Sequence, residues 1–253
     1  RVKDVVLFDP SEIEYPMALN MLEVQKNGER DYLIKEMRAI LKRFIREHFD
    51  ITDGGYYGPI FFQHVMNNML LAMSDSENPG TIIEFYAIFQ SDYFWRRWLP
   101  LKWENAILRN WVDEVLPNVN YNQNDRTNGS RHGDYFSGKF TDFVSDSRIQ
   151  NIFGQPRSTI DFTRAIEENK IVFVNLSKGL LGEANASFLG MILMAKITSA
   201  FMGRAKDIAK GKQLKPYYLY VDEFQSIATE NFSILLSEAR KFGLGLVLAN
   251  QYI

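Results

Sequence analysis

The chain has 253 residues, enough for one large α/β domain or for a core domain with an inserted lobe. Hydrophobic residues make up 46% and charged residues 24%, so the chain can bury a sizeable core. It contains no cysteine, which excludes disulfides, thiolate zinc sites and cysteine nucleophiles and fits a reducing compartment. The net charge of -2 gives no overall signature for nucleic acid, so a DNA-binding surface has to be local or lie outside this chain.

The first part of the chain predicts one short strand followed by a mostly helical region. The apolar run Val5–Phe8 ends at Asp9-Pro10, which is typical of a buried strand that ends in a turn. After it, apolar residues recur at helical spacing, and a polar, asparagine-rich segment at 118–134 predicts a loop. The predicted helices of this region are 31–49, 59–73, 81–90, 103–115 and 136–149.

The last part of the chain alternates strands with helices, which predicts a parallel sheet covered by helices. The predicted strands are 170–176, 217–221 and 244–249, and the predicted helices between them are 183–210 and 231–242. The longest apolar stretch free of charge, 184–195, is shorter than the roughly 20 residues that cross a bilayer, and the start of the chain does not resemble a signal peptide. We therefore expect an α/β fold with a helical lobe at 15–151, inserted between core segments 1–14 and 152–253.

The strongest local signal is the run Tyr-Tyr-Leu-Tyr-Val-Asp-Glu-Phe at 217–224, in which an apolar strand leads directly to two carboxylates. Unpaired charges are not tolerated in the middle of a buried strand, so Asp222 and Glu223 are expected at its carboxyl end, where open α/β sheets bind ligands. This is the shape of a Walker B motif, in which Asp222 helps to hold the magnesium of a nucleotide and Glu223 polarises the attacking water as general base. The alternative is an ordinary strand followed by a solvated turn, and this segment alone does not separate the two.

Two further residues in this part of the chain have the chemistry of a nucleotide site. Gln251 follows the strand 244–249, where an amide can sense a γ-phosphate or orient the attacking water. Arg240 lies near the end of the helix 231–242, where a cation is favoured by the helix dipole. The alternative for Arg240 is an arginine finger that reaches the nucleotide of a neighbouring subunit.

Three segments together resemble one family. They are YLYVDEFQSIATENFSILLSEARKFGLGLVLANQYI at 218–253, RIQNIFGQPRSTIDFTRAIEENKIVFVNLSKGLLGEANASFLGMILMAKI at 148–197, and VVLFDPSEIEYPMALNMLE at 5–23. They are similar to the HerA/FtsK superfamily of motor ATPases, and within it to the TraD/TraG-like coupling proteins of conjugation and type IV secretion. The resemblance covers nearly the whole chain, most strongly after Ser147 and most weakly in the helical lobe.

The resemblance implies a RecA-like P-loop NTPase core that uses ATP and Mg²⁺. Residue by residue, it implies that Asp222 and Glu223 are the Walker B pair, that Gln251 is the sensor glutamine, and that Arg240 is the arginine of the EARKFG stretch. It further implies a ring, of six subunits, that hydrolyses ATP at subunit boundaries and moves DNA or feeds it to a secretion channel, with channel or relaxosome proteins as partners. The expected location is cytoplasmic, at the cytoplasmic face of the membrane, with any anchor outside this chain.

One departure from the family concerns the phosphate loop, G-x-x-x-x-G-K-[ST], whose backbone N–H groups and lysine hold the phosphates. The segment 133–140 has the glycine and lysine spacing, but Phe140 replaces the hydroxyl residue and no strand precedes it. In the family this loop lies just upstream of the strand matched by Val5–Phe8, so we expect it, and the central strand before it, ahead of Arg1. Both ends of the chain are then expected to be cut, and this chain by itself to bind ATP weakly and to be inactive.

The sequence also allows other functions. A non-catalytic ATPase-fold adaptor that binds a secretion or conjugation partner fits a missing phosphate loop, and a nuclease using Asp9, Asp222 and Glu223 needs a further metal ligand. The three histidines show no metal-ligand spacing. Two groups of residues are candidates for DNA contact, although a helical core and a solvated face are the simpler uses: Trp95, Arg96, Arg97, Trp98 and Trp103, and the lysines and arginine of 204–215.

Overall fold

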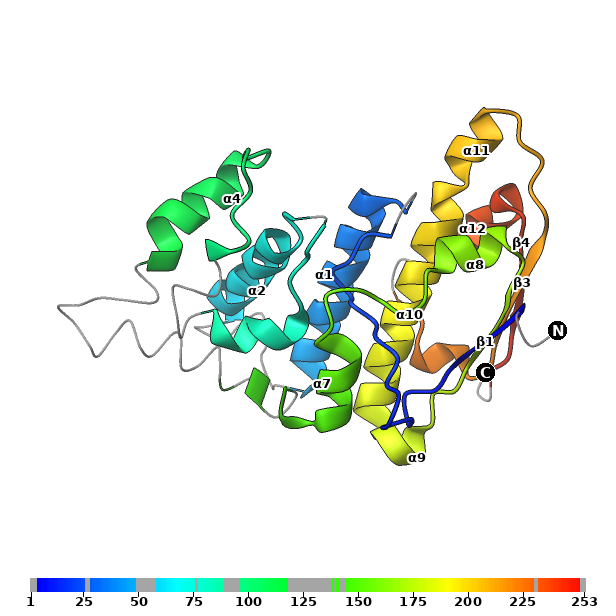
Figure 1. Ribbon diagram of the computed structural model, residues 1–253, viewed down its shortest axis with the longest axis horizontal. Coiled ribbons are helices and arrows are strands. Elements are labelled where there is room, and N and C mark those ends of the chain that lie inside the picture. Colours follow the sequence, from blue (N-terminus) through cyan, green and yellow to red (C-terminus); the bar gives the residue numbers. More distant parts are fainter. Residues whose placement is uncertain are drawn as a thin grey trace. The chain divides into compact units, whose positions relative to one another are not determined.

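The computed structural model describes residues 4–25, 28–48, 58–75, 77–88, 96–117, 138, 140–141, 144–229 and 232–250. The chain forms two compact units (Figure 1). Unit 1 comprises 1–17, 24–44 and 159–253, and unit 2 comprises 18–23 and 45–158. Unit 1 therefore contains most of the first long helix, α1 (Arg30–His48), in addition to the strands.

The four predicted strands are present in unit 1 and pair in parallel. β1 (Val5–Phe8) pairs with β2 (Ile171–Val174), from Val5 opposite Ile171 to Phe8 opposite Val174. β3 (Tyr217–Val221) pairs with β4 (Leu244–Leu248), from Tyr217 opposite Leu244 to Val221 opposite Leu248. Among the described residues these are two separate two-stranded sheets, whereas the sequence predicted one continuous sheet.

The helices of unit 1 follow the strands in the expected alternation, with two short helices that the sequence did not predict. Those two are α8 (Phe162–Glu167) and α9 (Lys178–Leu181). The others are α10 (Glu183–Gly203), α11 (Ala205–Ala209) and α12 (Phe232–Glu238), with the 3₁₀ helices η4 (Phe224–Ser226) and η5 (Ala239–Phe242).

The predicted helix 183–210 is interrupted at Arg204, between α10 and α11. The guanidinium of Arg204 donates hydrogen bonds to the carbonyl oxygens of Phe242 (2.9 Å) and Lys215 (2.8 Å). These bonds tie the break to the segments that lie just before the amino ends of β3 and β4. Helical periodicity carries no information about such bonds, so the sequence could not locate the break.

α10 is the central helix of unit 1, and most of its residues are buried. Together with α11 it forms one segment, Glu183–Ala209, that by length and composition alone is apolar enough to cross a membrane, although 83% of its most apolar window is buried inside the protein. A helix that is apolar on all sides and covered by protein is a core helix. The length of the charge-free stretch 184–195 therefore does not decide the matter, and the burial of α10 assigns it to the core.

Gly190 marks a close approach between α10 and the segment that follows β3. A Cβ atom at this position would overlap Ile227 Cγ2 and lie 3.0 Å from Leu176 Cδ1. We therefore expect Gly190→Ala to lower the free energy of unfolding by about 1–3 kcal/mol, the usual cost of overpacking, despite the better helix propensity of alanine. Chemical denaturation measures this loss. The matched control is Gly179→Ala in α9, where a Cβ meets nothing within 4 Å, and an equal loss in both variants would contradict the packing argument.

Unit 2 is mostly helical, as predicted. Its helices are α2 (Gly58–Ala72), the 3₁₀ helix η2 (Ile82–Ala87), α4 (Ala106–Asn110), the π-helix η3 (Trp111–Val115) and α7 (Ser147–Phe153). The helix α2 has the predicted length, whereas η2 is shorter than the predicted helix 81–90. Capping side chains set two of the starts. Asn105 accepts hydrogen bonds from the backbone N–H groups at the start of α4, and Asp146 does the same for α7.

Candidate functional site

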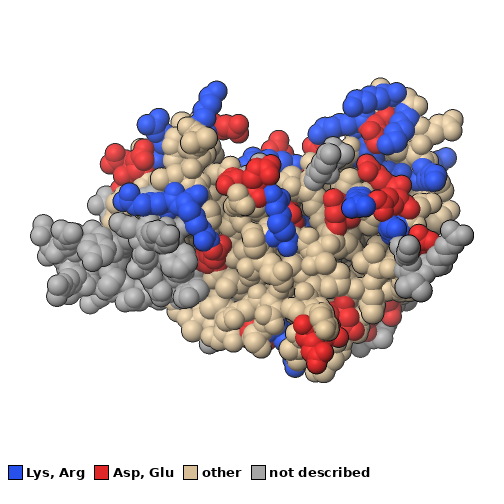
Figure 2. Space-filling view, viewed as in Figure 1, with Lys and Arg blue, Asp and Glu red and all other residues tan. Residues whose placement is uncertain are grey.

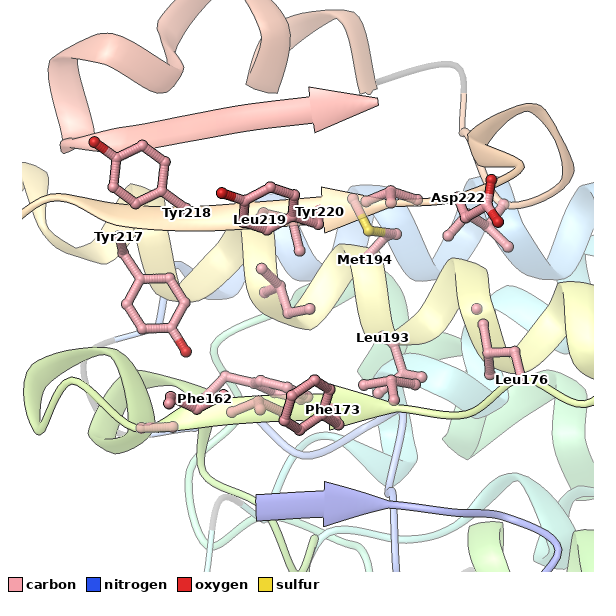
Figure 3. Close-up of a pocket in the computed structure, with 18 of the residues that line it drawn as sticks. Phe162, Phe173, Leu176, Leu193, Met194, Tyr217, Tyr218, Leu219, Tyr220 and Asp222 are labelled. Carbon is pink, nitrogen blue, oxygen red and sulfur yellow. The ribbon is translucent and has the colours of Figure 1, made fainter. Parts of the chain in front are cut away.

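The carboxyl ends of the strands carry polar side chains. Asp9 follows β1, Asn175 follows β2, and Asp222 and Glu223 follow β3 directly. Figure 3 shows Asp222 at the end of β3, beyond the tyrosines of that strand. The predicted position of the two carboxylates, at the carboxyl end of an apolar strand, is therefore confirmed, while their roles remain a prediction.

Glu223 is held in an unusual backbone conformation. Its φ of 49° and ψ of 44° lie in the left-handed region, which costs a non-glycine residue about 1–3 kcal/mol. Its N–H donates to Asp222 Oδ1 (3.0 Å), and its carbonyl oxygen accepts from the Ser226 N–H (3.0 Å) and from Ser226 Oγ (2.9 Å). Strain of this kind persists where the surroundings fix it, and it gathers at functional sites.

Lys178 contacts the Glu223 carboxylate directly, with 2.6 Å between Nζ and Oε2. It belongs to α9, which starts just after β2, so the ion pair joins the ends of β2 and β3. The hydrogen bond to Glu223 raises the pKa of the Lys178 amine above its ordinary value. Sequence analysis assigned Lys178 no role, because its only signal was a position shortly after a strand end.

Three hydrogen bonds fix the segment that follows Glu223, two of them with α1 and one with α10. Arg43 of α1 donates to the Ala228 carbonyl oxygen (3.0 Å), and the Thr229 hydroxyl donates to the buried carboxylate of Glu36 (2.8 Å). From α10, Ser187 Oγ donates to the Ser226 carbonyl oxygen (2.6 Å). The turn that carries the two carboxylates is thus supported from two helices.

Asp9 lies in a separate cluster. Hydrogen bonds from Ser11, and then from Asn175, lower the pKa of the Asp9 carboxyl. The Asn175 amide reaches Asp9 Oδ2 at 3.2 Å and so ties together the ends of β1 and β2. The described residues contain no group of three or more His, Asp or Glu side chains that could hold a metal, and this gives the nuclease reading no support.

The structure does not bring Arg240 to the carboxylates within one chain. Arg240 lies exposed in η5, just before the amino end of β4, whereas Asp222 and Glu223 follow the carboxyl end of the parallel strand β3. Strands of five residues separate the two ends by roughly 17 Å. A role at a nucleotide therefore requires the Arg240 of a neighbouring subunit. Gln251 lies outside the described residues.

A cavity of about 900 Å³ separates β2 from β3, which explains why the four strands form two sheets (Figure 3). Its floor is α10, including Leu193 and Met194. At the amino end of the strands the Tyr217 hydroxyl crosses the gap and donates to the Lys170 carbonyl oxygen (2.7 Å). At the carboxyl end the lining includes Lys178, Asp222 and Glu223, so the candidate site opens into this cavity.

The donor chemistry at Asp222 fits a magnesium ion. Mg²⁺ in nucleotide sites is held by one or two carboxylates together with phosphate oxygens and water. Asp222 is exposed at the strand end, where a phosphate can approach. In the segment 133–140, Gly138 and Phe140 are helical, and Phe140 is fully buried in unit 2 against Phe85; the other residues of this segment lie outside the described residues.

Among the described aromatic and histidine candidates of unit 2, Trp98 and His64 are core residues, whereas Trp103 is only partly buried. Trp98 is only 2% exposed, and Arg97 stacks on its ring at 5.3 Å while forming an ion pair with Glu84. His64 is buried beside Trp111, with 5.9 Å between the rings. The Trp95 and His132 positions lie outside the described residues, as does the His48 side chain.

The lysines predicted as a candidate DNA contact gather on and after α11, at the upper right of Figure 2. Two of them are engaged in ion pairs, Lys206 with Glu29 (2.9 Å) and Lys212 with Asp207 (2.8 Å). Lys210 and Lys215 are exposed. This group, Lys206, Lys210, Lys212 and Lys215, is called the basic patch below.

Comparison with known proteins gives a likeness in structure but not in sequence. No protein-family model and no curated protein matches the chain. Among solved structures, the chain is similar to the bacterial conjugative coupling protein TrwBdeltaN70 in its unbound monoclinic form, with a TM-score of 0.46 and 11% sequence identity. The likeness covers 98% of this chain and 51% of that one, so the chain spans about half the length of that protein.

Proposed function

We propose that this chain is part of an ATP-driven, DNA-translocating motor subunit of the conjugative coupling-protein kind. The observation that carries the proposal is the pair Asp222–Glu223, which directly follows an apolar parallel strand, with the Glu223 backbone held in a left-handed conformation. A solvated turn needs no such strain. A general base that must point in one direction benefits from it.

In this proposal each residue has one task. Asp222 holds Mg²⁺, which neutralises charge on the nucleotide phosphates when bound. Glu223 accepts a proton from the attacking water, Gln251 orients that water, and Arg240 reaches the nucleotide of the next subunit. The last assignment requires a ring, for which we propose six subunits, and it agrees with the separation of Arg240 from Glu223 within one chain.

The basic patch is the proposed local contact with DNA, since the net charge of -2 leaves the chain as a whole without attraction for phosphates. The lysines of the patch are candidates to face the DNA that passes through the ring. Channel or relaxosome proteins, and a location at the cytoplasmic face of a membrane, complete the proposal.

Charge reversal in the patch tests the DNA contact. We expect Lys210→Glu with Lys215→Glu to weaken DNA binding at every sequence and to lower the slope of log affinity against log salt by about 1 for each lost phosphate contact. Fluorescence anisotropy with labelled DNA at several salt concentrations measures both effects. Lys35→Glu, at an exposed position of α1, changes the net charge in the same direction and is the control. If this single change weakens DNA binding by as much per charge as the double change in the basic patch, the effect comes from the net charge. The assignment of the basic patch to DNA contact then fails.

A further inference from the structure

We infer that Lys178 is a positioning residue that restrains Glu223 in the absence of nucleotide and releases it when a phosphate group binds. This inference rests on the proposed function, since it assigns Glu223 the role of base. It adds a second side chain to the site, from a part of the chain to which sequence analysis gave no role.

The first support is geometric. The Lys178 ammonium lies 2.6 Å from Glu223 Oε2, while the Glu223 backbone is fixed by Asp222 on one side and Ser226 on the other. Because the backbone is fixed, the direction of the Glu223 carboxylate depends on its side-chain partner, and Lys178 is that partner in this structure. A carboxylate oxygen that accepts a hydrogen bond from an ammonium is less able to accept a proton from water.

The second support is the local structure around Lys178. Lys178 is the first residue of the four-residue helix α9, which ends at Leu181. The next residue, Gly182, has a φ of 78°, which is readily adopted only by glycine. A Cβ placed on Gly179 or Gly182 meets nothing within 4 Å, so no side chain crowds this turn, and only Leu181 anchors it by burial. Leu181 keeps α9 in the core, so release of Glu223 requires only that the Lys178 side chain turns, and no described neighbour of Gly179 or Gly182 obstructs this turn.

The third support is the chemistry of the cavity mouth. Lys178 and Glu223 both line the cavity, and side chains 43% and 32% exposed are accessible to a ligand from solvent. A bound nucleotide phosphate carries several negatively charged oxygens and competes for the ammonium with a single carboxylate. Once Lys178 turns to the phosphate, Glu223 Oε2 is available to the attacking water. No bond is made or broken in this step.

The strength of the ion pair limits the size of the effect. Exposed pairs of this kind shift a population by about 1.4- to 5-fold. Lys178 is therefore expected to tune the resting rate of the motor and not to switch it completely. A purely structural surface pair would change the labelling but not the turnover described next.

Amine labelling tests the pair without any turnover. Only a neutral amine reacts, and Glu223 raises the pKa of the Lys178 amine, so removing the charge should speed its modification. We expect Lys178 in Glu223→Gln to be acylated about 2- to 5-fold faster than in the wild type, as quantified by peptide mass spectrometry. Lys241, paired with Glu238 at 3.1 Å, is the internal control and should not change. Equal Lys178 rates in both proteins would overturn the inference.

Steady-state kinetics of the full-length protein without DNA test the restraint itself. Lys178→Met removes the restraint on Glu223 together with the cation that binds the phosphate, so it should raise kcat by about 2- to 5-fold and also raise KM for ATP, whereas Lys178→Arg, which keeps a cation, should remain close to wild type. Arg164→Gln, which removes an exposed ion pair of similar length (2.7 Å, to Glu168), is the matched control. Unchanged or reduced turnover in Lys178→Met would overturn the restraint. A failure of the proposed function would give a different result, namely wild-type turnover in the Glu223→Gln variant.

Discussion

Replacing Glu223 by glutamine should abolish ATP turnover in the full-length protein while leaving ATP binding intact. Glutamine keeps the shape and the left-handed turn but cannot accept a proton, and loss of a general base costs at least ~100-fold in rate. Phosphate release measures turnover, and titration with a fluorescent nucleotide measures binding. Lost turnover with intact binding indicates that the general base is missing, whereas loss of both indicates that the nucleotide site is missing.

The control for this variant is Glu168→Gln. Glu168 is also an exposed glutamate in a short ion pair, with 2.7 Å between its Oε1 and Arg164 Nε, but it lies in the turn after α8 and has no part in the proposed site. It should turn over ATP like the wild type. Wild-type turnover in Glu223→Gln would remove the base assignment, and a wild-type protein that binds a secretion or conjugation partner but shows no turnover would favour the adaptor.

The strand-and-carboxylate part of the site could be predicted from the sequence because it is local. An apolar run such as 217–221 fixes both the strand and the position of the charges that follow it, since charges are excluded from the buried part. The same reasoning located β1, β2 and β4 within one or two residues. Their pairing into two sheets with a cavity between them could not be predicted, because it depends on contacts between distant segments.

The remaining features of the site were hidden because they depend on long sequence separations or on backbone geometry. Lys178 and Glu223 are 45 residues apart, and Thr229 and Glu36 are 193 apart. Neither pair has a periodic signature. The left-handed conformation of Glu223 was also hidden, because that region is ordinarily used by glycine or asparagine and the residue type gave no sign of it.

The candidate site also depends on the core beneath it, and this gives the largest stability effect that we predict. Phe188 of α10 is fully buried, and its ring lies 4.3 Å from that of Phe44. Phe188→Ala leaves a cavity that the surrounding helices cannot close, so we expect a loss of about 3–5 kcal/mol in the free energy of unfolding. Chemical denaturation followed by circular dichroism measures this loss.

The matched control is Phe173→Ala, the same substitution in the same unit. The Phe173 side chain is 58% exposed, so its removal should change the free energy of unfolding by no more than about 1 kcal/mol. Ser187, the neighbour of Phe188, donates to the Ser226 carbonyl and thereby supports the turn of Glu223. If α10 positions the site, Phe188→Ala must also lower turnover under conditions in which the variant remains folded. A variant that loses stability but keeps full turnover would show that the turn is held without α10.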